Sequence, residues 1–193
     1  MSTPTTGLGR LAAILTTESD EPVIHTPAQP GVSVETVAVV ADVWQGEQII
    51  TLSFTSLTEL LATQGYSPQE PTVVELLHGS ALLPFQIPAE RMPDFMQAVF
   101  IINRLLPVCS YGLDVEQGVC YLQCGLLTSP PDLPPEIAID AVGHAVTAIQ
   151  QYAPYLVAIA AGSTTLAQFR AHLKSRHILP PPLPIVTQEM PLP

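Results

Sequence analysis

The sequence contains few basic residues. Six of its 193 residues are lysine or arginine, against 17 aspartates and glutamates, and the formal net charge is −11. Proteins bind nucleic acid largely by neutralising phosphates with lysine and arginine, so this composition argues against a nucleic-acid partner. Arg170, Lys174 and Arg176 share one C-terminal segment, which we interpret as a solvated helix face rather than a contact for an acidic partner.

Long apolar runs are also missing. Runs such as 155–161 are far too short to cross a bilayer, which takes about 20 residues. The sequence does not start with a charged segment followed by an apolar one, as a secretory signal does. Its three cysteines, an odd number, do not suggest the disulfide framework of a secreted protein. We therefore expect a cytoplasmic protein that does not enter a membrane.

Familiar catalytic motifs are absent. The sequence has no GxGxxG, no Walker loop, no HExxH and no GxSxG, which are the motifs of nucleotide-binding proteins and common hydrolases. His78-Gly79-Ser80 and Gly162-Ser163 contain possible nucleophiles, but no aspartate or histidine can be paired with them, and we interpret both as turns. The sequence therefore predicts no enzyme and no cofactor.

One polar stripe has metal-ligand chemistry. Glu136, Asp140 and His144 follow one another at four-residue steps, so they lie on one face of a predicted helix and could ligate a metal or move protons. No second cluster is visible that would complete a coordination shell. We interpret the stripe as a solvated helix face and predict no metal site.

The cysteines leave two possibilities open. Cys120 and Cys124 lie on one predicted strand, ~13 Å apart at ~3.3 Å per residue, too far to share a bridge or a metal ion. A two-residue turn before that strand places Cys109 opposite Cys124, where the two can be oxidised, whereas a three-residue turn places them on opposite faces. We favour the three-residue turn ending at Gly118 and expect three free, buried thiols.

What the sequence does contain is strand-like alternation. Six segments combine a period of two with β-branched or aromatic residues. They follow one another as hairpins rather than in βαβ order, which predicts an α+β fold with one antiparallel sheet of about five or six strands packed against helices. The predicted strands are 36–44, 48–54, 72–77, 81–87, 108–115 and 119–127, with turns at 45–47, 78–80 and 116–118.

Helical spacing marks most of the remaining chain. Pro93 and Asp94 favour the start of a helix over 92–106, which Pro107 ends. A second long helix over 135–152 meets a break or kink at Pro154. Shorter helices are predicted over 8–15, before a loop at 18–31, over 56–65, and after a capping box formed by Thr165 and Gln168.

These elements predict one domain with peripheral ends. Residues 1–31 form an N-terminal helix and a proline-rich loop, 32–179 the α+β domain, and 180–193 a flexible proline-rich tail. Pro181 and Pro184 have the PxxP spacing that suits an aromatic-lined groove. We attribute this spacing to chance, because the tail contains so many prolines.

The centre of the chain resembles a known family. It combines a helix with Pro93 near its start and Ile102-Asn103 near its end, a hairpin with Leu113-Asp114 and the Gly-Val-Cys-Tyr of 118–121, and a long helix that runs into the Gln-Tyr-Ala-Pro-Tyr of 151–155. Over 36–169 these features resemble the YbjN-like family, whose fold is shared with type III secretion chaperones. The family often has a basic residue where this chain has Gln123. The resemblance implies a non-catalytic protein-binding module that is chaperone-like, adaptor-like or regulatory.

The helix over 92–106 points to an interface. It has more apolar positions than one sheet face can cover, and the chain is 47% hydrophobic with only 12% charged residues. We interpret Phe95, Met96, Phe100 and Ile101 as a possible interface with a second copy, forming a homodimer, or with an unidentified protein or peptide. The alternative is a small-ligand sensor or an enzyme whose pocket the sequence does not reveal.

Overall fold

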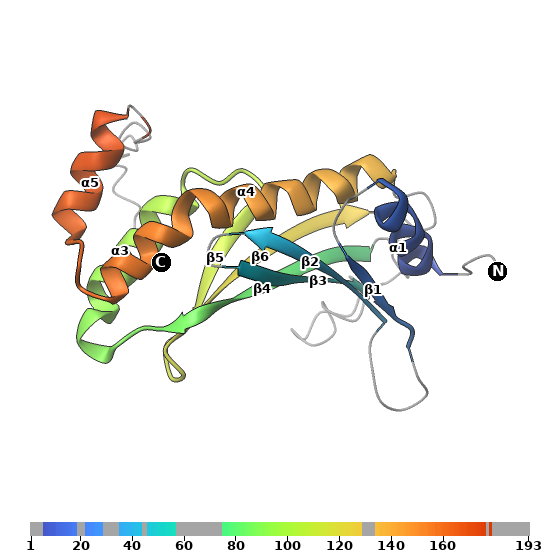
Figure 1. Cartoon of the computed structure of the whole chain (residues 1–193), viewed down its shortest axis with the longest axis horizontal. Helices are drawn as coiled ribbons and strands as arrows, with labels where there is room; N and C mark the ends of the chain where they lie inside the picture. Colours follow the sequence, from blue (N-terminus) through green and yellow to red (C-terminus); the bar gives the residue numbers. More distant parts are fainter. Residues whose placement is uncertain are drawn as a thin grey trace, which may run out of the picture.

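Segments with alternating apolar and β-branched residues favour strands, and in this chain they form one antiparallel sheet. The computed structural model describes residues 6–18, 22–28, 35–43, 46–56, 75–128, 134–176 and 178. Within these residues six strands follow the order β1-β2-β3-β4-β6-β5 (Figure 1). The strands are β1 Val23–Thr26, β2 Thr36–Val43, β3 Gly46–Ser56, β4 Glu75–Gln86, β5 Cys109–Asp114 and β6 Val119–Thr128. The predicted α+β class and the antiparallel sheet are confirmed.

Helices complete the fold. The described helices are α1 Gly7–Glu18, the short 3-10 helix η1 Ala89–Arg91, α3 Met92–Asn103, α4 Pro135–Ala160 and α5 Leu166–Ser175. Helix α4 runs along one face of the sheet, and α1 lies on the same side (Figure 1). The predicted end of the second long helix at residue 152 and the predicted break at Pro154 are wrong, because α4 continues through Pro154 to Ala160. Proline removes one helical hydrogen bond, but the buried neighbours Ala153 and Leu156 hold this part of α4 in the core.

The core lies between these helices and the sheet. Alternate residues of β2 are buried, among them Val37 and Val39, while the residues between them are more exposed. The same core includes Leu8, Leu11 and Leu15 of α1. The N-terminal helix is therefore not peripheral, although the sequence predicted that both ends of the chain are.

A strand replaces part of a predicted loop. The sequence predicted a loop over 18–31, but Val23–Thr26 form β1 and pair with β2. The backbone N–H of Val40 also donates to the carbonyl oxygen of Pro22, at 2.9 Å. The prolines on both sides of this short segment led to the prediction of a loop. Its strand conformation depends on pairing with a neighbouring strand rather than on its own four residues.

The predicted turn at His78-Gly79-Ser80 is also wrong. These residues lie in the middle of β4, which pairs with β3 on one side and with β6 on the other. A Cβ atom added to Gly79 would lie 3.0 Å from the Cδ2 atom of Leu52. The close approach of the Leu52 side chain therefore favours glycine here, and no turn is involved.

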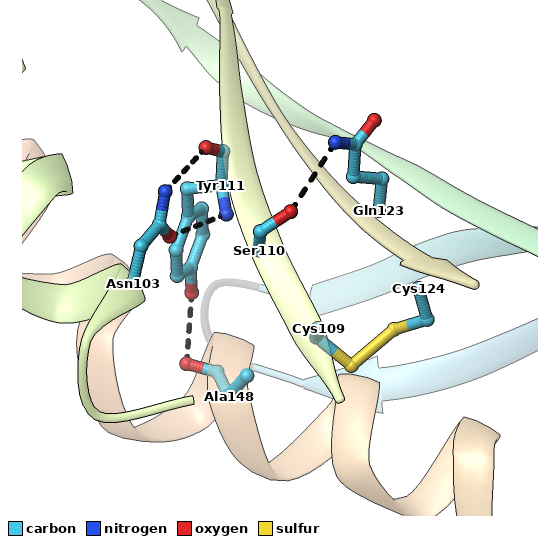
Figure 2. Close-up of a disulfide and its surroundings, with 7 residues drawn as sticks. All are labelled: Asn103, Cys109, Ser110, Tyr111, Gln123, Cys124 and Ala148. Carbon is cyan, nitrogen blue, oxygen red and sulfur yellow. Dashed lines mark hydrogen bonds between the residues drawn. A yellow bond between two sulfur atoms is a disulfide. The ribbon is translucent and has the colours of Figure 1, made fainter. Parts of the chain in front are cut away.

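The hairpin of β5 and β6 corrects the prediction for the cysteines. Asp114 pairs with Val119, so the turn contains the four residues 115–118, and Gly118 has a φ of +66°. An even number of turn residues places Cys109 opposite Cys124, and the two form a disulfide (Figure 2). The predicted three-residue turn and three free thiols are wrong, whereas Cys120 is free and buried.

The last helix agrees with its prediction. The backbone N–H of Gln168 donates to Oγ1 of Thr165 at 3.2 Å, and the N–H of Thr165 donates to Oε1 of Gln168 at 2.9 Å. These bonds form the capping box of α5.

Residues 57–65 of another predicted helix, 72–74 of a predicted strand and the tail with Pro181 and Pro184 lie outside the described residues.

Candidate interaction surface

The two faces of the sheet differ in what covers them. Helices α1 and α4 lie on one face, which we call the covered face (Figure 1), and contact β1, β2, β4, β5 and β6 there. Within the described part of the chain, no helix lies on the opposite face, which we call the open face. Since neighbouring residues of a strand point to opposite faces, the buried positions identify the residues of the open face.

One row of the open face crosses all six strands. The strand pairing places Ile24, Ala38, Thr51, Ser80, Gln123 and Ser110 side by side in this order. None of these residues carries a charge. Acidic residues of the described strands lie toward strand ends, as Asp42 and Asp114 do. The middle of the open face therefore carries no carboxylate, lysine or arginine on the described strands, and His78 is its one histidine.

Large aliphatic side chains are exposed on this face. Ile24, Ile49, Leu82 and Leu127 come from four different strands, and each is more than half exposed. Single exposed apolar residues are common on soluble proteins, but a group of them on one uncharged face is typical of an interaction site. The sequence did not predict this surface, because alternation gives a strand two faces without showing which of them a helix covers.

The structure separates the residues that were predicted as a possible interface. Phe95 is fully buried and packs edge to face on Phe85, with 6.0 Å between the ring centroids. Ile101 is partly buried against the core. Met96 and Phe100 are exposed, Phe100 by 76%, and lie one helical turn apart on α3. Of the four residues, only these two present large exposed surfaces.

One edge of the sheet is blocked by a side chain. Strand β5 is an edge strand, and its Tyr111 has backbone groups that face away from β6 (Figure 2). The amide of Asn103 binds both of these groups: Oδ1 accepts from the Tyr111 N–H at 2.7 Å, and Nδ2 donates to the Tyr111 carbonyl at 2.9 Å. Unpaired edges invite the addition of another strand. Asn103 occupies this position at the centre of β5.

Three ionisable side chains lie in the core beside α4. Burial raises the pKa of the Cys120 thiol to about 12. Burial is also the main cause that raises the pKa of Tyr111, with smaller contributions from Cys120 and Tyr152, and burial raises the pKa of Tyr152. The hydroxyl of Tyr111 donates to the carbonyl of Ala148 in α4, at 2.8 Å (Figure 2). Because the thiolate is the reactive form of cysteine, Cys120 is a packing residue at neutral pH.

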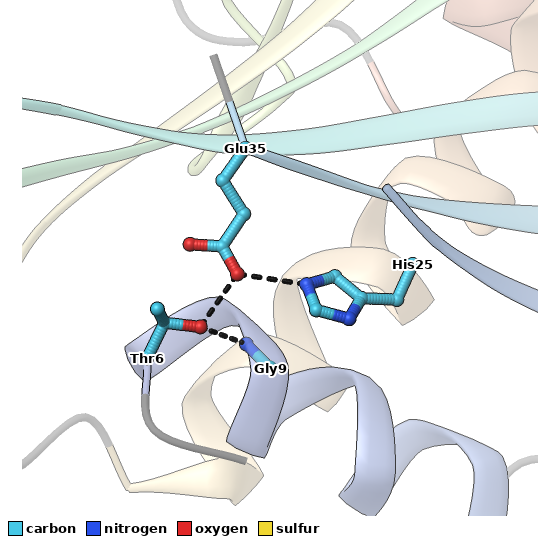
Figure 3. A network of polar contacts seen from close by, with 4 residues as sticks. All are labelled: Thr6, Gly9, His25 and Glu35. Carbon is cyan, nitrogen blue, oxygen red and sulfur yellow. Dashed lines mark hydrogen bonds and ion pairs between the residues drawn. The ribbon is translucent and has the colours of Figure 1, made fainter. Parts of the chain in front are cut away.

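A second polar cluster ties the N-terminal helix to the sheet. Glu35 Oε1 lies 2.7 Å from Nε2 of His25 and accepts from the hydroxyl of Thr6 at 2.5 Å (Figure 3). The Thr6 oxygen also accepts from the backbone N–H of Gly9, as an N-cap does. In a catalytic triad the imidazole contacts the hydroxyl, whereas here the carboxylate lies between the two. This geometry is that of a helix cap.

The predicted polar stripe lies on the surface of α4. Glu136, Asp140 and His144 are exposed, and among the described residues no three histidine, cysteine or carboxylate side chains gather as metal ligands. Asp140 and His144 line a small hollow of about 130 Å³.

Among the described helices, none is long and apolar enough to cross a membrane.

Comparison with known proteins gives no family for this chain. No protein-family model matches it, and no curated protein sequence is significantly similar to it. Function is therefore inferred from the fold and the surface of this chain.

Proposed function

We propose that this protein is a non-catalytic protein-binding module, chaperone-like, adaptor-like or regulatory, and that a second copy of the chain binds to its open face. The observation that carries the proposal is the uncharged row across six strands, with Ile24, Ile49, Leu82 and Leu127 exposed on the same face. Removing apolar surface from water contributes roughly 25 cal/mol per Å². Covering these four side chains would therefore stabilise a dimer.

The size of the open face suits such a dimer. Strands ~4.8 Å apart give a six-stranded face ~24 Å in width, and eight residues of strand extend ~26 Å. The resulting footprint of roughly 600 Å² in projection approaches the ~800 Å² that each partner buries in an interface of standard size.

Charge favours contact at this face over contact elsewhere. Two chains that each carry a net charge of −11 repel one another. Their closest approach is least costly where both surfaces lack charge, and an interface around a two-fold axis brings the same uncharged row of both copies together. The exposed pair Met96 and Phe100 on α3 then remains available to an unidentified protein or peptide.

Family and cell compartment remain predictions of the sequence. The resemblance to the YbjN-like family supports a chaperone-like role, since that family shares its fold with dimeric chaperones. A cytoplasmic location was expected from the odd number of cysteines. The disulfide between Cys109 and Cys124 counts against it, because disulfides are rare in the reducing cytoplasm. Trapping of free thiols in cells distinguishes a reducing cytoplasm, where Cys109 and Cys124 would react, from an oxidising compartment, where the disulfide would protect them.

Sedimentation equilibrium tests the proposal. We expect the wild-type chain to be a dimer, and Leu82→Asp to be a folded monomer, because Leu82 is exposed at the surface of the single chain and the new charge would be buried in the dimer. Val115→Asp is the matched control, since Val115 is exposed at the β5–β6 turn, away from the row.

Phe100→Asp separates the two candidate surfaces. If the open face forms the dimer, this variant stays dimeric. A monomeric wild-type chain at its highest soluble concentration would contradict self-association. If Phe100→Asp dissociates the dimer and Leu82→Asp does not, the dimer interface lies on α3 rather than on the open face. Turnover of a substrate that one polar substitution abolishes would contradict the non-catalytic function.

A further inference from the structure

Two adjacent hollows lie along helix α4. The larger, about 250 Å³, lies between α4 and the connection from α3 to β5, and the smaller, about 130 Å³, lies toward the N-terminal end of α4. Val108 and His144 line both hollows. The hollows are therefore neighbours, and we call them together the α4 groove. The groove is separate from the open face, because α4 covers the opposite side of the sheet (Figure 1).

The larger hollow has a mainly apolar lining. Leu105, Leu106 and Val108 contribute aliphatic surface from the connection, and Ala148 and Tyr152 contribute buried surface from α4. Thr147 and Gln151 are exposed polar residues of α4 that also line this hollow. A pocket with an apolar interior and a few polar groups is typical of a small-molecule site.

The smaller hollow contains a negatively charged side chain, Asp140. Asp140 is exposed and lines it together with the partly exposed Ile137. Among the described residues that line the two hollows there is no lysine or arginine, so an anionic group would find no permanent positive charge there, and the nearest basic side chain is the imidazole of His144. The net charge of −11 adds to the repulsion of anions. A cationic head group is therefore favoured beside Asp140.

The dimensions limit the tail of such a ligand. An apolar cavity of ~150 Å³ is large enough for benzene, and the larger hollow of about 250 Å³ exceeds it. At ~1.5 Å per helical residue, Asp140 lies ~18 Å along α4 from Tyr152. A linear chain of about eight to ten carbons fits within this length and volume.

We propose that the α4 groove binds a small amphiphile with a primary ammonium head and an aliphatic tail. The ammonium group lies beside the Asp140 carboxylate, and the tail lies between Val108 and Ala148 in the larger hollow. This site goes beyond the proposed protein-binding function and is independent of it, since dimerisation through the open face leaves the groove accessible.

Titration with three probes followed by amide NMR tests this site. Octylamine, octanol and octanoate share a tail and differ in the head group. We expect saturable binding of octylamine, weaker binding of octanol and the weakest binding of octanoate, with shifted resonances in residues 105–109 and 137–152. Equal affinity of all three probes, non-saturable shifts, a preference for octanoate or no binding would overturn the proposal.

Two variants locate the head and the tail. Asp140→Asn should lower the affinity for octylamine by about two- to fivefold, the range expected for a solvent-exposed ion pair, and leave octanol binding unchanged. Glu136→Gln is the matched control, because Glu136 is also exposed on α4 but does not line the groove. Thr147→Phe, which fills the larger hollow, should weaken octylamine and octanol alike. Wild-type affinity for octylamine in Asp140→Asn or in Thr147→Phe would overturn the assignment.

Discussion

At the residue scale, one amide side chain occupies the backbone hydrogen-bonding groups at the edge of the sheet. Asn103 is the only asparagine of the chain, and its two bonds to Tyr111 take the place of a neighbouring strand. An amide is suited to this role because it offers one donor and one acceptor, as the backbone of a strand does. In the sequence, Ile102-Asn103 is one of the features that resemble a known family, and in the structure Asn103 has a physical role at the edge of the sheet.

Replacing Asn103 should destabilise the protein. Asn103→Leu removes both partners of the Tyr111 backbone, and we expect the free energy of unfolding to fall by about 1–3 kcal/mol. Asn103→Asp keeps the acceptor for the Tyr111 N–H but places a second carboxylate oxygen against the Tyr111 carbonyl oxygen in place of the Nδ2 donor, so it should also destabilise the protein. Urea unfolding followed by circular dichroism measures both changes. Equal stability of Asn103→Leu and the wild type would show that water replaces the amide.

Alkaline pH should also destabilise the protein. The pKa of Cys120 rises on folding from an ordinary value of 9.0 to about 12, so the folded state retains a proton that the unfolded state loses. The resulting stability is fully present below pH 9 and is lost as the pH rises toward about 12, with a slope of up to about 1.4 kcal/mol per pH unit for one such group.

Unfolding in urea at a series of pH values measures this slope. Tyr111 and Tyr152 add to the loss above their ordinary pKa of 10.0, since burial raises their pKa values too. Cys120→Ala should flatten the decline that begins near pH 9. An identical pH profile in Cys120→Ala would show that the thiol does not contribute.

At the scale of elements, the β5–β6 hairpin shows how one turn residue changes a prediction. A turn of three residues and the observed turn of four residues differ in parity, and parity decides whether Cys109 and Cys124 share a face. The covered face that carries the disulfide packs on α4, which contacts both strands. The hairpin is therefore held by its own cross-link as well as by the helix.

Removing the disulfide should destabilise the hairpin and with it the domain. The bond closes a loop with a sequence separation of 15, for which chain entropy gives about 3 kcal/mol. The double variant Cys109→Ala with Cys124→Ala should lower the urea midpoint accordingly. Cys120→Ala retains the bond and is the control for loss of a buried cysteine. If a reducing agent lowers the midpoint of Cys120→Ala but not that of the double variant, the bond is the cause.

At the scale of the whole molecule, the acidic surface and the uncharged open face have opposite effects on self-association. A net charge of −11 keeps copies of the chain apart, while the exposed aliphatic residues of the open face favour contact. Because salt screens charges over distances of ~10 Å at 0.1 M, it should change this balance.

Salt should therefore strengthen the proposed dimer. We expect its dissociation constant to fall as sodium chloride is raised from low to moderate concentration, since long-range repulsion weakens and apolar contact does not. Sedimentation equilibrium at several salt concentrations measures this dependence. A dimer that dissociates as salt rises would instead be held by ion pairs, contrary to an uncharged interface.

The sequence by itself determined the classes of the elements and the antiparallel sheet. Alternation in 36–54 and 108–127, the prolines in the first turns of α3 and α4, and the capping box of Thr165 are local signals, and local signals report local structure. Residues two positions apart in a strand share a face, as the buried pair Ile50 and Leu52 shows.

Only the tertiary structure decided which surfaces are available. The pairing of β1, the continuous strand at Gly79 and the passage of α4 through Pro154 depend on neighbours that are distant in sequence. So do the burial of Phe95 and the exposure of Leu82, which have similar hydrophobicity but lie on different sides of the packed layers. The physical reason is that apolar side chains are buried by contacts across the fold, and these contacts are set by topology and register rather than by local pattern.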